Sequence, residues 1–208
     1  MIIDPKLTNP TAKTGHTKQL FSVPVFVKDV SLEVQQAITA EIDAKIEAVR
    51  TGGPTIKPFG GTVESTFCYG QQDVAYHDLR QLNEAVNVAL MEYLIDEEYQ
   101  DPQSGFRVTE TWFNFNKPHG LALQHSHIGR RLHVIYYYQT NGEDGDLELI
   151  HPVPHCQFGH FPYDSPIEIL HRIKPKIGRI VIMPAWLEHR VAENTTSDER
   201  ISICFNLV

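Results

Sequence analysis

The sequence is poor in cysteine, and its few cysteines are not arranged to act together. Cys68, Cys156 and Cys204 are widely spaced, odd in number and form no C-x-x-C motif. A disulfide framework and a cysteine-ligated zinc site are therefore not expected, and isolated thiols favour a reducing, cytoplasmic location.

Long apolar runs and basic clusters are also missing. No stretch comes near the roughly 18 consecutive apolar residues of a membrane-spanning helix, and no apolar run follows a basic start. The net charge is −8, and no run of Lys or Arg forms a local basic patch. This balance argues against binding to a nucleic-acid backbone. We therefore expect neither a membrane nor a nucleic acid as a partner.

The remaining composition is that of an ordinary globular protein. Hydrophobic residues make up 41% of the 208 residues and charged residues 21%, which suits one well-packed domain. No internal repeat or linker divides the chain, so we expect a single domain over residues 1–208. An N-terminal arm and helices occupy 1–105 of it, and a β-rich core occupies 106–208.

Two amphipathic helices are expected in the N-terminal part. Apolar residues recur at helical spacing over about 32–50, after Ser31 as a candidate N-cap. A second helix is expected to begin at Asp73 or His77 and to run to about Glu97.

Short strands are expected beside these helices. Leu20–Val27 is typical of a strand, and Pro24 within it predicts an edge position. Such an edge could pair with a second copy of the chain in a homodimer. Another short strand is expected near Thr66–Tyr69.

The C-terminal half contains eight short β-rich segments, most of them separated by turn residues. They are Arg107–Asn116, Leu121–His125, Leu132–Gln139, Asp146–Ile150, Glu168–Ile173, Arg179–Met183, His189–Ala192 and Arg200–Leu207. Strands that follow helices in this way indicate an α+β fold. We expect a double-sheet jelly roll with the N-terminal helices packed on one sheet.

Histidine is the residue type in excess, with 11 copies that lie mostly between His119 and His189. His125 and His127 form an H-x-H motif at the end of a predicted strand. Because side chains alternate along a strand, these two point to one face, with their Cα atoms roughly 6.6 Å apart. They could share a metal ion, and His189 is the candidate third ligand. An isolated H-x-H is otherwise typical of a surface turn.

The last predicted strand carries an R-x-S motif. Period two places Arg200, Ser202 and Cys204 on one face. An arginine that faces a β core requires an anion, because burying it unpaired is costly. Its planar fork suits a carboxylate. The alternative is a salt bridge to one of the 26 acidic residues of the chain.

The order of H-x-H, a distal histidine and R-x-S resembles that of the iron(II)- and 2-oxoglutarate-dependent oxygenases. These enzymes are built on a double-stranded β-helix, a cupin-like jelly roll. More narrowly, the chain resembles a bacterial and phage branch of 2OG-Fe(II) oxygenases. Besides the two motifs, the resemblance rests on Trp112, Asn114, Ile135-Tyr136-Tyr137, Gly178 to His189, and the ending Glu199 to Asn206.

The resemblance implies that iron(II) and 2-oxoglutarate act together to hydroxylate a substrate. It implies that His125 and His189 bind the iron and that Arg200 pairs with the far carboxylate of 2-oxoglutarate, with Ser202 nearby. In prolyl-hydroxylase-like relatives the second tyrosine of an I-Y-Y run binds the cosubstrate, and this position is Tyr137 here.

The strand that carries Tyr137 offers two more residues to the same wall. Period two puts Arg131, His133 and Tyr137 on one face, which favours all three as pocket-lining residues.

The chain departs from the resembling family at several positions. Most members have Asp or Glu where this chain has His127, which gives them a two-histidine, one-carboxylate triad. Three histidines also suit catalytic zinc, and His127 could instead face away from the metal. The narrow branch usually has Pro where Ile128 stands, and Ser-Gly where His133-Val134 stands.

Two other functions stay open. One is a cupin-type enzyme with three histidines and no 2-oxoglutarate, although its first motif would need a Glu where Arg131 stands. The other is a non-catalytic barrel that binds a metal or a ligand. Arg200 in the R-x-S motif favours the oxygenase. The substrate, a small molecule or a peptide, is not specified, and the histidine-rich segment His151–Pro175 reads equally as a lid or as a solvated loop.

Overall fold

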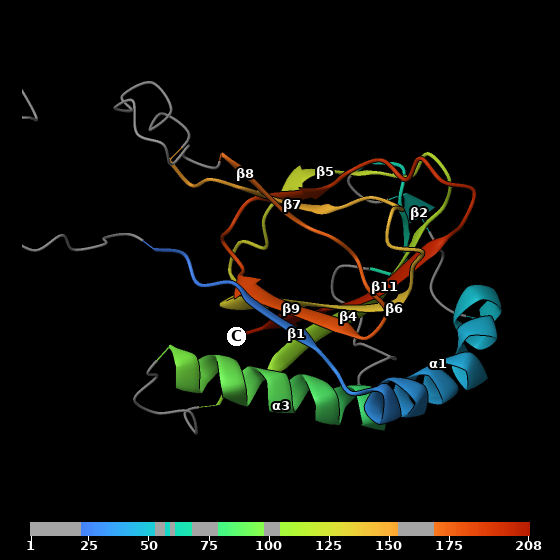
Figure 1. The fold of residues 1–208 in the computed structure, drawn as a ribbon, viewed down its shortest axis with the longest axis horizontal. Helices are drawn as coiled ribbons and strands as arrows, with labels where there is room; N and C mark the ends of the chain where they lie inside the picture. The colour runs from blue at the N-terminus through green and yellow to red at the C-terminus, as the bar shows by residue number, and fades with distance from the viewer. Residues whose placement is uncertain (1–21, 53–56, 59–60, 68–78, 98–104, 154–168) are drawn as a thin grey trace, which may run out of the picture.

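The computed structural model describes residues 22–52, 57–58, 61–67, 79–97, 105–153 and 169–208. Two helices and two antiparallel sheets are arranged in layers. In Figure 1 the helices lie along the outer face of the larger sheet, and the smaller sheet lies on its other side. Among the described residues, no helix is both long and apolar enough to span a membrane.

The helices are α1 (Leu32–Gly52) and α3 (Arg80–Asp96). The strands are β1 (Phe26–Asp29), β2 (Lys57–Pro58), β3 (Glu64–Ser65), β4 (Val108–Asn116), β5 (Ala122–His125), β6 (Leu132–Gln139), β7 (Leu147–Ile150), β8 (Leu170–Ile173), β9 (Arg179–Pro184), β10 (His189–Val191) and β11 (Arg200–Leu207).

The strands form a seven-stranded sheet in the order β1-β9-β6-β11-β4-β3-β2 and a four-stranded sheet in the order β5-β10-β7-β8. Every pairing is antiparallel. The predicted α+β double-stranded β-helix, with N-terminal helices on one sheet, is therefore confirmed.

Strand boundaries agree best where the hydrophobic pattern is longest. β6 and β11 have the predicted bounds, and the other predicted C-terminal strands shift by one or two residues. The strand predicted at Leu20–Val27 is instead Phe26–Asp29, so Pro24 precedes it. Its edge position is confirmed, because β1 pairs only with β9 in the described sheet.

The helix boundaries follow local capping chemistry. The Ser31 hydroxyl accepts a hydrogen bond from the backbone N–H of Val34 at 3.4 Å, as an N-cap does. Helix α3 begins at Arg80 after Leu79, which makes no side-chain capping bond. The predicted starts at Asp73 and His77 lie outside the described residues.

Of the strand predicted near Thr66–Tyr69, Thr66 and Phe67 are not in a strand, and residues 68–69 lie outside the described residues. Strand β3 ends at Ser65, and Thr66 continues the pairing by donating its N–H to the Phe113 carbonyl at 3.0 Å.

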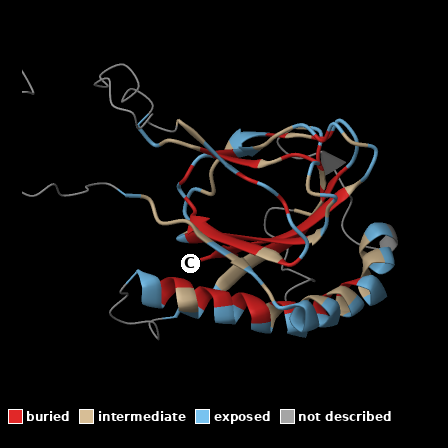
Figure 2. Ribbon diagram, viewed as in Figure 1, coloured by how far each residue is buried: buried red, intermediate tan, exposed pale blue. Residues whose placement is uncertain are grey.

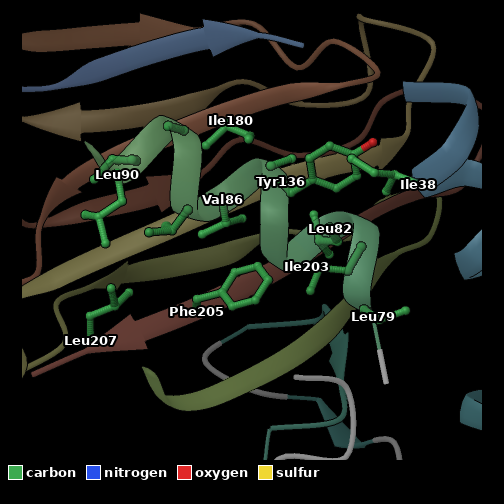
Figure 3. Close-up of a cluster of buried hydrophobic side chains, with 14 of the residues drawn as sticks. Ile38, Leu79, Leu82, Val86, Leu90, Tyr136, Ile180, Ile203, Phe205 and Leu207 are labelled. Carbon is green, nitrogen blue, oxygen red and sulfur yellow. The ribbon is translucent and has the colours of Figure 1, made fainter. Parts of the chain in front are cut away.

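Helix α3 is attached to the large sheet by an apolar core. Leu82 and Val86 of the helix are buried in the same cluster as Tyr136, Ile203 and Phe205 of the sheet (Figure 3). Figure 2 shows the buried face of each helix turned toward the strands and the exposed face turned outward. Because burial of such side chains contributes roughly 1.5–3 kcal/mol each, this core holds the helix layer on the sheet.

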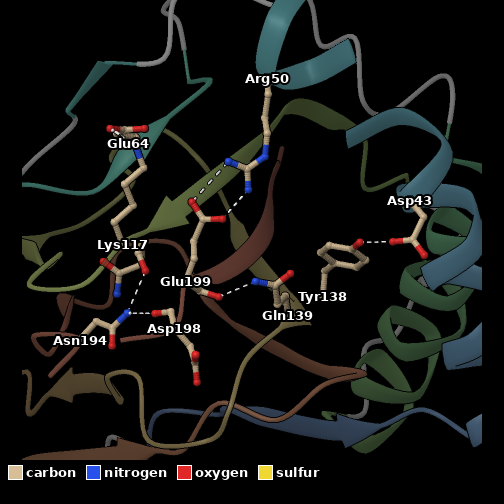
Figure 4. A network of polar contacts seen from close by, with 10 residues as sticks. Asp43, Arg50, Glu64, Lys117, Tyr138, Gln139, Asn194, Asp198 and Glu199 are labelled. Atoms are coloured by element: carbon tan, nitrogen blue, oxygen red, sulfur yellow. Dashed lines mark hydrogen bonds and ion pairs between the residues drawn. The ribbon is translucent and has the colours of Figure 1, made fainter. Parts of the chain in front are cut away.

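A second core lies between the two sheets, and the central strands contribute to both. Tyr136 belongs to the helix-side core, whereas Tyr137 belongs to the inter-sheet core. The neighbouring Tyr138 turns back to the helices, where its hydroxyl donates to Asp43 of α1 (Figure 4). Alternation along β6 thus sends one tyrosine of the three to the interior between the sheets.

Polar contacts also tie helix α1 to the start of β11. Arg50 forms an ion pair with Glu199, and its guanidinium lies 4.5 Å from the Phe115 ring centroid. The Glu199 carbonyl accepts a hydrogen bond from Gln139 Nε2 at 2.7 Å (Figure 4). The residue just before Arg200 is therefore held from two sides.

Removal of one core side chain should test how strongly α3 is bound. Leu82 is 0% exposed, so Leu82→Ala should lower the free energy of unfolding by about 2–5 kcal/mol, as a large cavity-forming change does. Val88 of the same helix is 53% exposed, and Val88→Ala should change it by less than about 0.5 kcal/mol. Urea unfolding followed by circular dichroism measures both, and equal losses would contradict this packing.

Candidate metal centre and cosubstrate pocket

A cavity lies between the two sheets and contains nearly all the predicted site residues. Its walls are Val63, Trp112, Asn114, Ala122, His125, His127, His133, Ile135, Tyr137, Leu147, His189, Val191, Arg200, Ser202 and Cys204. The small sheet supplies two histidines, and the large sheet supplies the arginine and the tyrosine.

Three histidines converge at this cavity. One ring nitrogen from each of His125, His127 and His189 lies within 4.8 Å of the others. His125 ends β5 and His189 begins β10, and the two are direct partners in the antiparallel register. Their ring centroids are 4.4 Å apart.

His127 joins the cluster from a loop, and not from a strand shared with His125 as predicted. Strand β5 ends at His125, so the two histidines of the H-x-H motif do not share a regular strand. The His127 backbone N–H instead donates to the Ala185 carbonyl at 2.8 Å, which links this loop to the turn before β10.

The hydrogen bonds of two histidines select the tautomer that a metal requires. His125 Nδ1 lies 2.7 Å from the Leu123 carbonyl, and His189 Nδ1 lies 2.9 Å from the Leu187 carbonyl. A carbonyl can only accept, so each Nδ1 carries the proton and each Nε2 keeps its lone pair. His127 Nε2 is buried and has no hydrogen-bond partner among the described residues. This donor set fits a divalent ion such as iron or zinc.

Burial keeps the imidazoles of His127 and His189 neutral. Burial first, and then the neighbouring histidines, lower the pKa of His189 to about 4 and that of His127 to about 3. The pKa of His133 is also held well below its ordinary value, first by burial and then by the nearby imidazoles. Neutral imidazole is the form that binds metals.

Arg200 is a buried cation on the opposite wall. Its side chain is almost fully buried, and its Nη1 donates to the Gly145 carbonyl. With the Asn116 amide turned to satisfy its neighbours, the Asn116 oxygen accepts from Arg200 Nη2 at 3.2 Å. Arg200 Nε stays buried without a partner, and no described acidic residue forms an ion pair with this guanidinium. The predicted alternative, a structural salt bridge, therefore has no support in the described part of the chain.

Ser202 and Tyr137 stand beside Arg200 in the cavity wall. They are register partners across β11 and β6, and both line the cavity. The Arg200 guanidinium carbon lies 5.9 Å from the centroid of the Tyr137 ring. Burial raises the pKa of Tyr137 to about 12, against the opposing effect of Arg200. The hydroxyl therefore stays protonated and available as a donor.

Cys204 is the third cavity-facing residue of β11, and it is a free, buried cysteine. Its Sγ accepts a hydrogen bond from Asn114 Nδ2 at 3.3 Å. Burial raises the pKa of the thiol to about 12, so the group is neutral. Cys68 and Cys156 lie outside the described residues.

One predicted wall residue lies elsewhere. Arg131 does not share the face of His133 and Tyr137, because β6 begins only at Leu132 and the chain turns before it. The Arg131 guanidinium lies 4.3 Å from the centroid of the Phe106 ring. The prediction that Arg131 lines the pocket is therefore wrong.

The described residues of the histidine-rich segment do not line the cavity. His151 and His171 do not line it, and His155 and His160 lie outside the described residues.

The sequence did not point to the residues that orient Arg200. Asn116 ends β4 and gives no motif, since its partners lie far along the chain. Gly145 has φ 104°, and a Cβ there would stand 2.4 Å from the Ala192 carbonyl oxygen. Only glycine fits this close approach. The sequence marked Gly145 as a turn, but its carbonyl also contacts Arg200.

Comparison with known proteins agrees with this geometry. Residues 110–206 match the family described as "Putative 2OG-Fe(II) oxygenase". A search of curated proteins finds no match.

Solved structures share the fold at low sequence identity. A prolyl-4-hydroxylase from Pseudomonas putida is 13% identical with a TM-score of 0.59, over 89% of this chain and 92% of that one. SnoN, an alpha-ketoglutarate-dependent epimerase of nogalamycin biosynthesis, is 14% identical with a TM-score of 0.62, over 89% and 78%. HygX from Streptomyces hygroscopicus, solved with nickel, 2-oxoglutarate and hygromycin B, is 11% identical with a TM-score of 0.56, over 89% and 82%.

The jelly roll, the three-histidine cluster and the match over residues 110–206 define a class of protein. This class is that of the iron(II)- and 2-oxoglutarate-dependent oxygenases, to which the chain is similar over residues 110–206.

The lowered histidine pKa values predict a pH dependence for the metal-free protein. Unfolded histidine titrates near 6.5, whereas folded His189 and His127 titrate only near 4 and 3. Above pH 6.5 neither state binds these protons, so this contribution to stability is fully present. Below pH 6.5 the two histidines become protonated in the unfolded state but not in the folded state, so the free energy of unfolding falls.

Urea unfolding of metal-free protein at about pH 7.5 and about pH 5.5, where carboxylates stay ionised, measures this loss. His127→Asn should make the loss smaller, while His119→Asn, at an exposed histidine paired with Glu193, should not. An unchanged loss in His127→Asn would contradict the assignment.

Proposed function

We propose that His125, His127 and His189 hold one iron(II) ion and that Arg200, with Ser202 and Tyr137, binds 2-oxoglutarate. A single observation carries the proposal. Three convergent imidazoles and a buried arginine without an acidic partner among the described residues wall the same cavity. The histidine cluster calls for a metal ion and the arginine for an anion, and the described residues supply neither.

The residues divide the work between the two ends of the cavity. Iron(II) held by the three histidines would supply the centre at which dioxygen is activated, so that 2-oxoglutarate would become succinate and carbon dioxide and the substrate would gain a hydroxyl. Arg200 neutralises the far carboxylate and fixes the direction in which the cosubstrate lies. The Tyr137 and Ser202 hydroxyls add donors beside it. The apolar walls Ile135, Leu147 and Val191 exclude water from the site.

A third histidine at the position of the usual carboxylate alters the charge of the centre. Three neutral imidazoles leave a divalent ion one unit more positive than two imidazoles and a carboxylate would. This makes the site more attractive to an anionic ligand, which suits the dianion 2-oxoglutarate. It should also make oxidation of the metal to the ferric state harder.

A cupin-type enzyme without 2-oxoglutarate is the second candidate, and the three histidines favour it. Arg200 argues against it, because such a reaction leaves a buried guanidinium with an unsatisfied Nε and no counter-ion among the described residues. An uncompensated buried charge is costly enough that we expect an anion to be its normal partner.

The mouth of the site supports a substrate with an apolar group, either a small molecule or a peptide. Ile128, next to His127, is 90% exposed, and Trp186, next to Ala185, is 53% exposed. The backbone hydrogen bond between His127 and Ala185 places the chain at Ile128 close to the chain at Trp186. Exposed apolar residues beside a metal site are typical of substrate contacts.

Replacement of one strand histidine should remove the metal. His189→Ala leaves two imidazoles, so iron(II) affinity should fall by more than the roughly 10–100-fold typical of losing an outer-shell partner. Anaerobic titration with iron(II) measures the affinity. The exposed His119 is the matched control, and His119→Ala should bind as wild type. Wild-type affinity in a folded His189→Ala would refute the centre.

Replacement of the arginine should separate cosubstrate binding from metal binding. Arg200→Lys keeps the charge but loses the fork, so 2-oxoglutarate affinity should fall about 10- to 100-fold, which corresponds to roughly 1.5–3 kcal/mol for one charge-assisted hydrogen bond. The visible charge-transfer band of anaerobic iron(II) protein titrated with 2-oxoglutarate reports this affinity. Arg190→Lys, at a half-exposed arginine paired with Glu148, is the control. Equal cosubstrate affinity in both variants would make Arg200 purely structural.

A further inference from the structure

His133 is a fourth histidine at the cavity, and the proposed function does not use it. The ring is 2% exposed and lines the cavity. It is not among the three histidines whose nitrogens converge. The resembling family branch has a small residue at this position, so His133 calls for an explanation within this chain.

The three candidate ligands are not oriented in the same way. Backbone carbonyls two residues earlier fix the rings of His125 and His189 through Nδ1. For His127 the structure gives no hydrogen bond to either ring nitrogen from the described residues, and the residue lies beyond the end of β5. Its ring plane therefore needs another support.

That support is the ring of His133. The two imidazoles are stacked with centroids 3.9 Å apart and planes 12° apart. Trp112 stacks with His133 at 5.6 Å and 28°, and it also lies 5.7 Å from the His127 ring. A parallel stack at this distance is ordinary van der Waals contact, and it resists tilting of the His127 ring.

His133 is itself locked by a row of side chains across three strands. Its Nδ1 lies 3.0 Å from Asn206 Oδ1, and Asn206 Nδ2 donates to Glu110 Oε2 at 2.6 Å. These three residues are register partners on β6, β11 and β4. Since Glu110 accepts from the amide nitrogen of Asn206, the amide oxygen is left to accept from His133.

Glu110, the last residue of this row, is linked through Arg130 to the loop that carries His127. Glu110 forms an ion pair with Arg130, whose Nε lies 3.0 Å from Glu110 Oε2. The Arg130 backbone N–H donates to the His127 carbonyl at 3.1 Å. The His127 backbone and the His127 ring are thus held by the two ends of one polar chain.

We propose that His133 is a positioning residue that holds the ring plane of His127 so that Nε2 faces the metal. This inference rests on the proposed function, because it gives His133 a role only if His127 binds the ion. It names a support that acts through stacking and not through a hydrogen bond to the ligand.

The test compares two changes at His133 that differ in shape. His133→Leu fills the space with a side chain that has no ring plane to stack on His127. His133→Phe keeps an aromatic ring and loses the hydrogen bond to Asn206. Cobalt(II) titration followed by its visible absorption measures metal affinity. His133→Leu should weaken it about 10- to 100-fold, as loss of an outer-shell partner does, and His133→Phe should restore most of it.

A double-mutant cycle with His127→Ala shows whether the effect passes through His127. His127→Ala should weaken cobalt(II) binding, and adding His133→Leu to it should change nothing more. Equal weakening by His133→Leu in both backgrounds would overturn the positioning role. So would wild-type affinity in His133→Leu, provided that His127→Ala weakens binding. If His127→Ala itself binds as wild type, the three-histidine centre fails instead.

Asn206→Ala serves where His133→Leu does not fold. It leaves both rings in place but frees His133, so cobalt(II) affinity should fall and the visible spectrum should broaden. Wild-type affinity and spectrum in folded Asn206→Ala would overturn the inference.

Discussion

Burial of β11 between two different environments is the constraint on which the site depends. Ile203 and Phe205 face the helices and pack into the apolar core beneath α3. Arg200, Ser202 and Cys204 face the other way, into the cavity between the sheets. Strand alternation makes these two sets inseparable, since a slip of one residue would exchange them. The apolar contacts of the outer face therefore fix where the polar groups of the inner face stand, and the cost of burying the arginine is offset by the whole core.

Much of this arrangement could be predicted, because it follows from local periodicity. The long apolar alternation of β6 and β11 gave their bounds, and with them the shared face of Tyr137, Arg200 and Ser202. What could not be predicted depends on contacts between distant segments. A regular strand through His127 was a reasonable expectation, yet the strand ends at His125, and the His127 N–H bonds to the distant Ala185 carbonyl. The hydrogen bond from Arg200 to the Gly145 carbonyl could not be predicted for the same reason, because the two residues are brought together only by the tertiary fold.

The two ends of the cavity are supported by different kinds of interaction. At the proposed metal end, backbone carbonyls orient His125 and His189, and the ring of His133 stacks on that of His127. At the cosubstrate end, Asn116 and a glycine carbonyl hold the guanidinium of Arg200. The supports share no residue, so metal affinity and cosubstrate affinity should respond to separate sets of substitutions. A site assembled in this way can change one ligand without losing the other.

The replacement of a carboxylate by His127 and the presence of His133 are best understood together. A carboxylate ligand carries charge and can be oriented by hydrogen-bond donors, whereas a neutral imidazole on a loop has a ring plane that must be fixed. The stacked ring of His133 meets that need without adding charge, because burial keeps its pKa well below the ordinary value. The acidic end of its support, Glu110, lies across two strands and is neutralised by Arg130. The usual triad places one carboxylate on the metal, and none of the groups proposed to face the metal here carries a negative charge. The carboxylate in this network, that of Glu110, is already paired with Arg130.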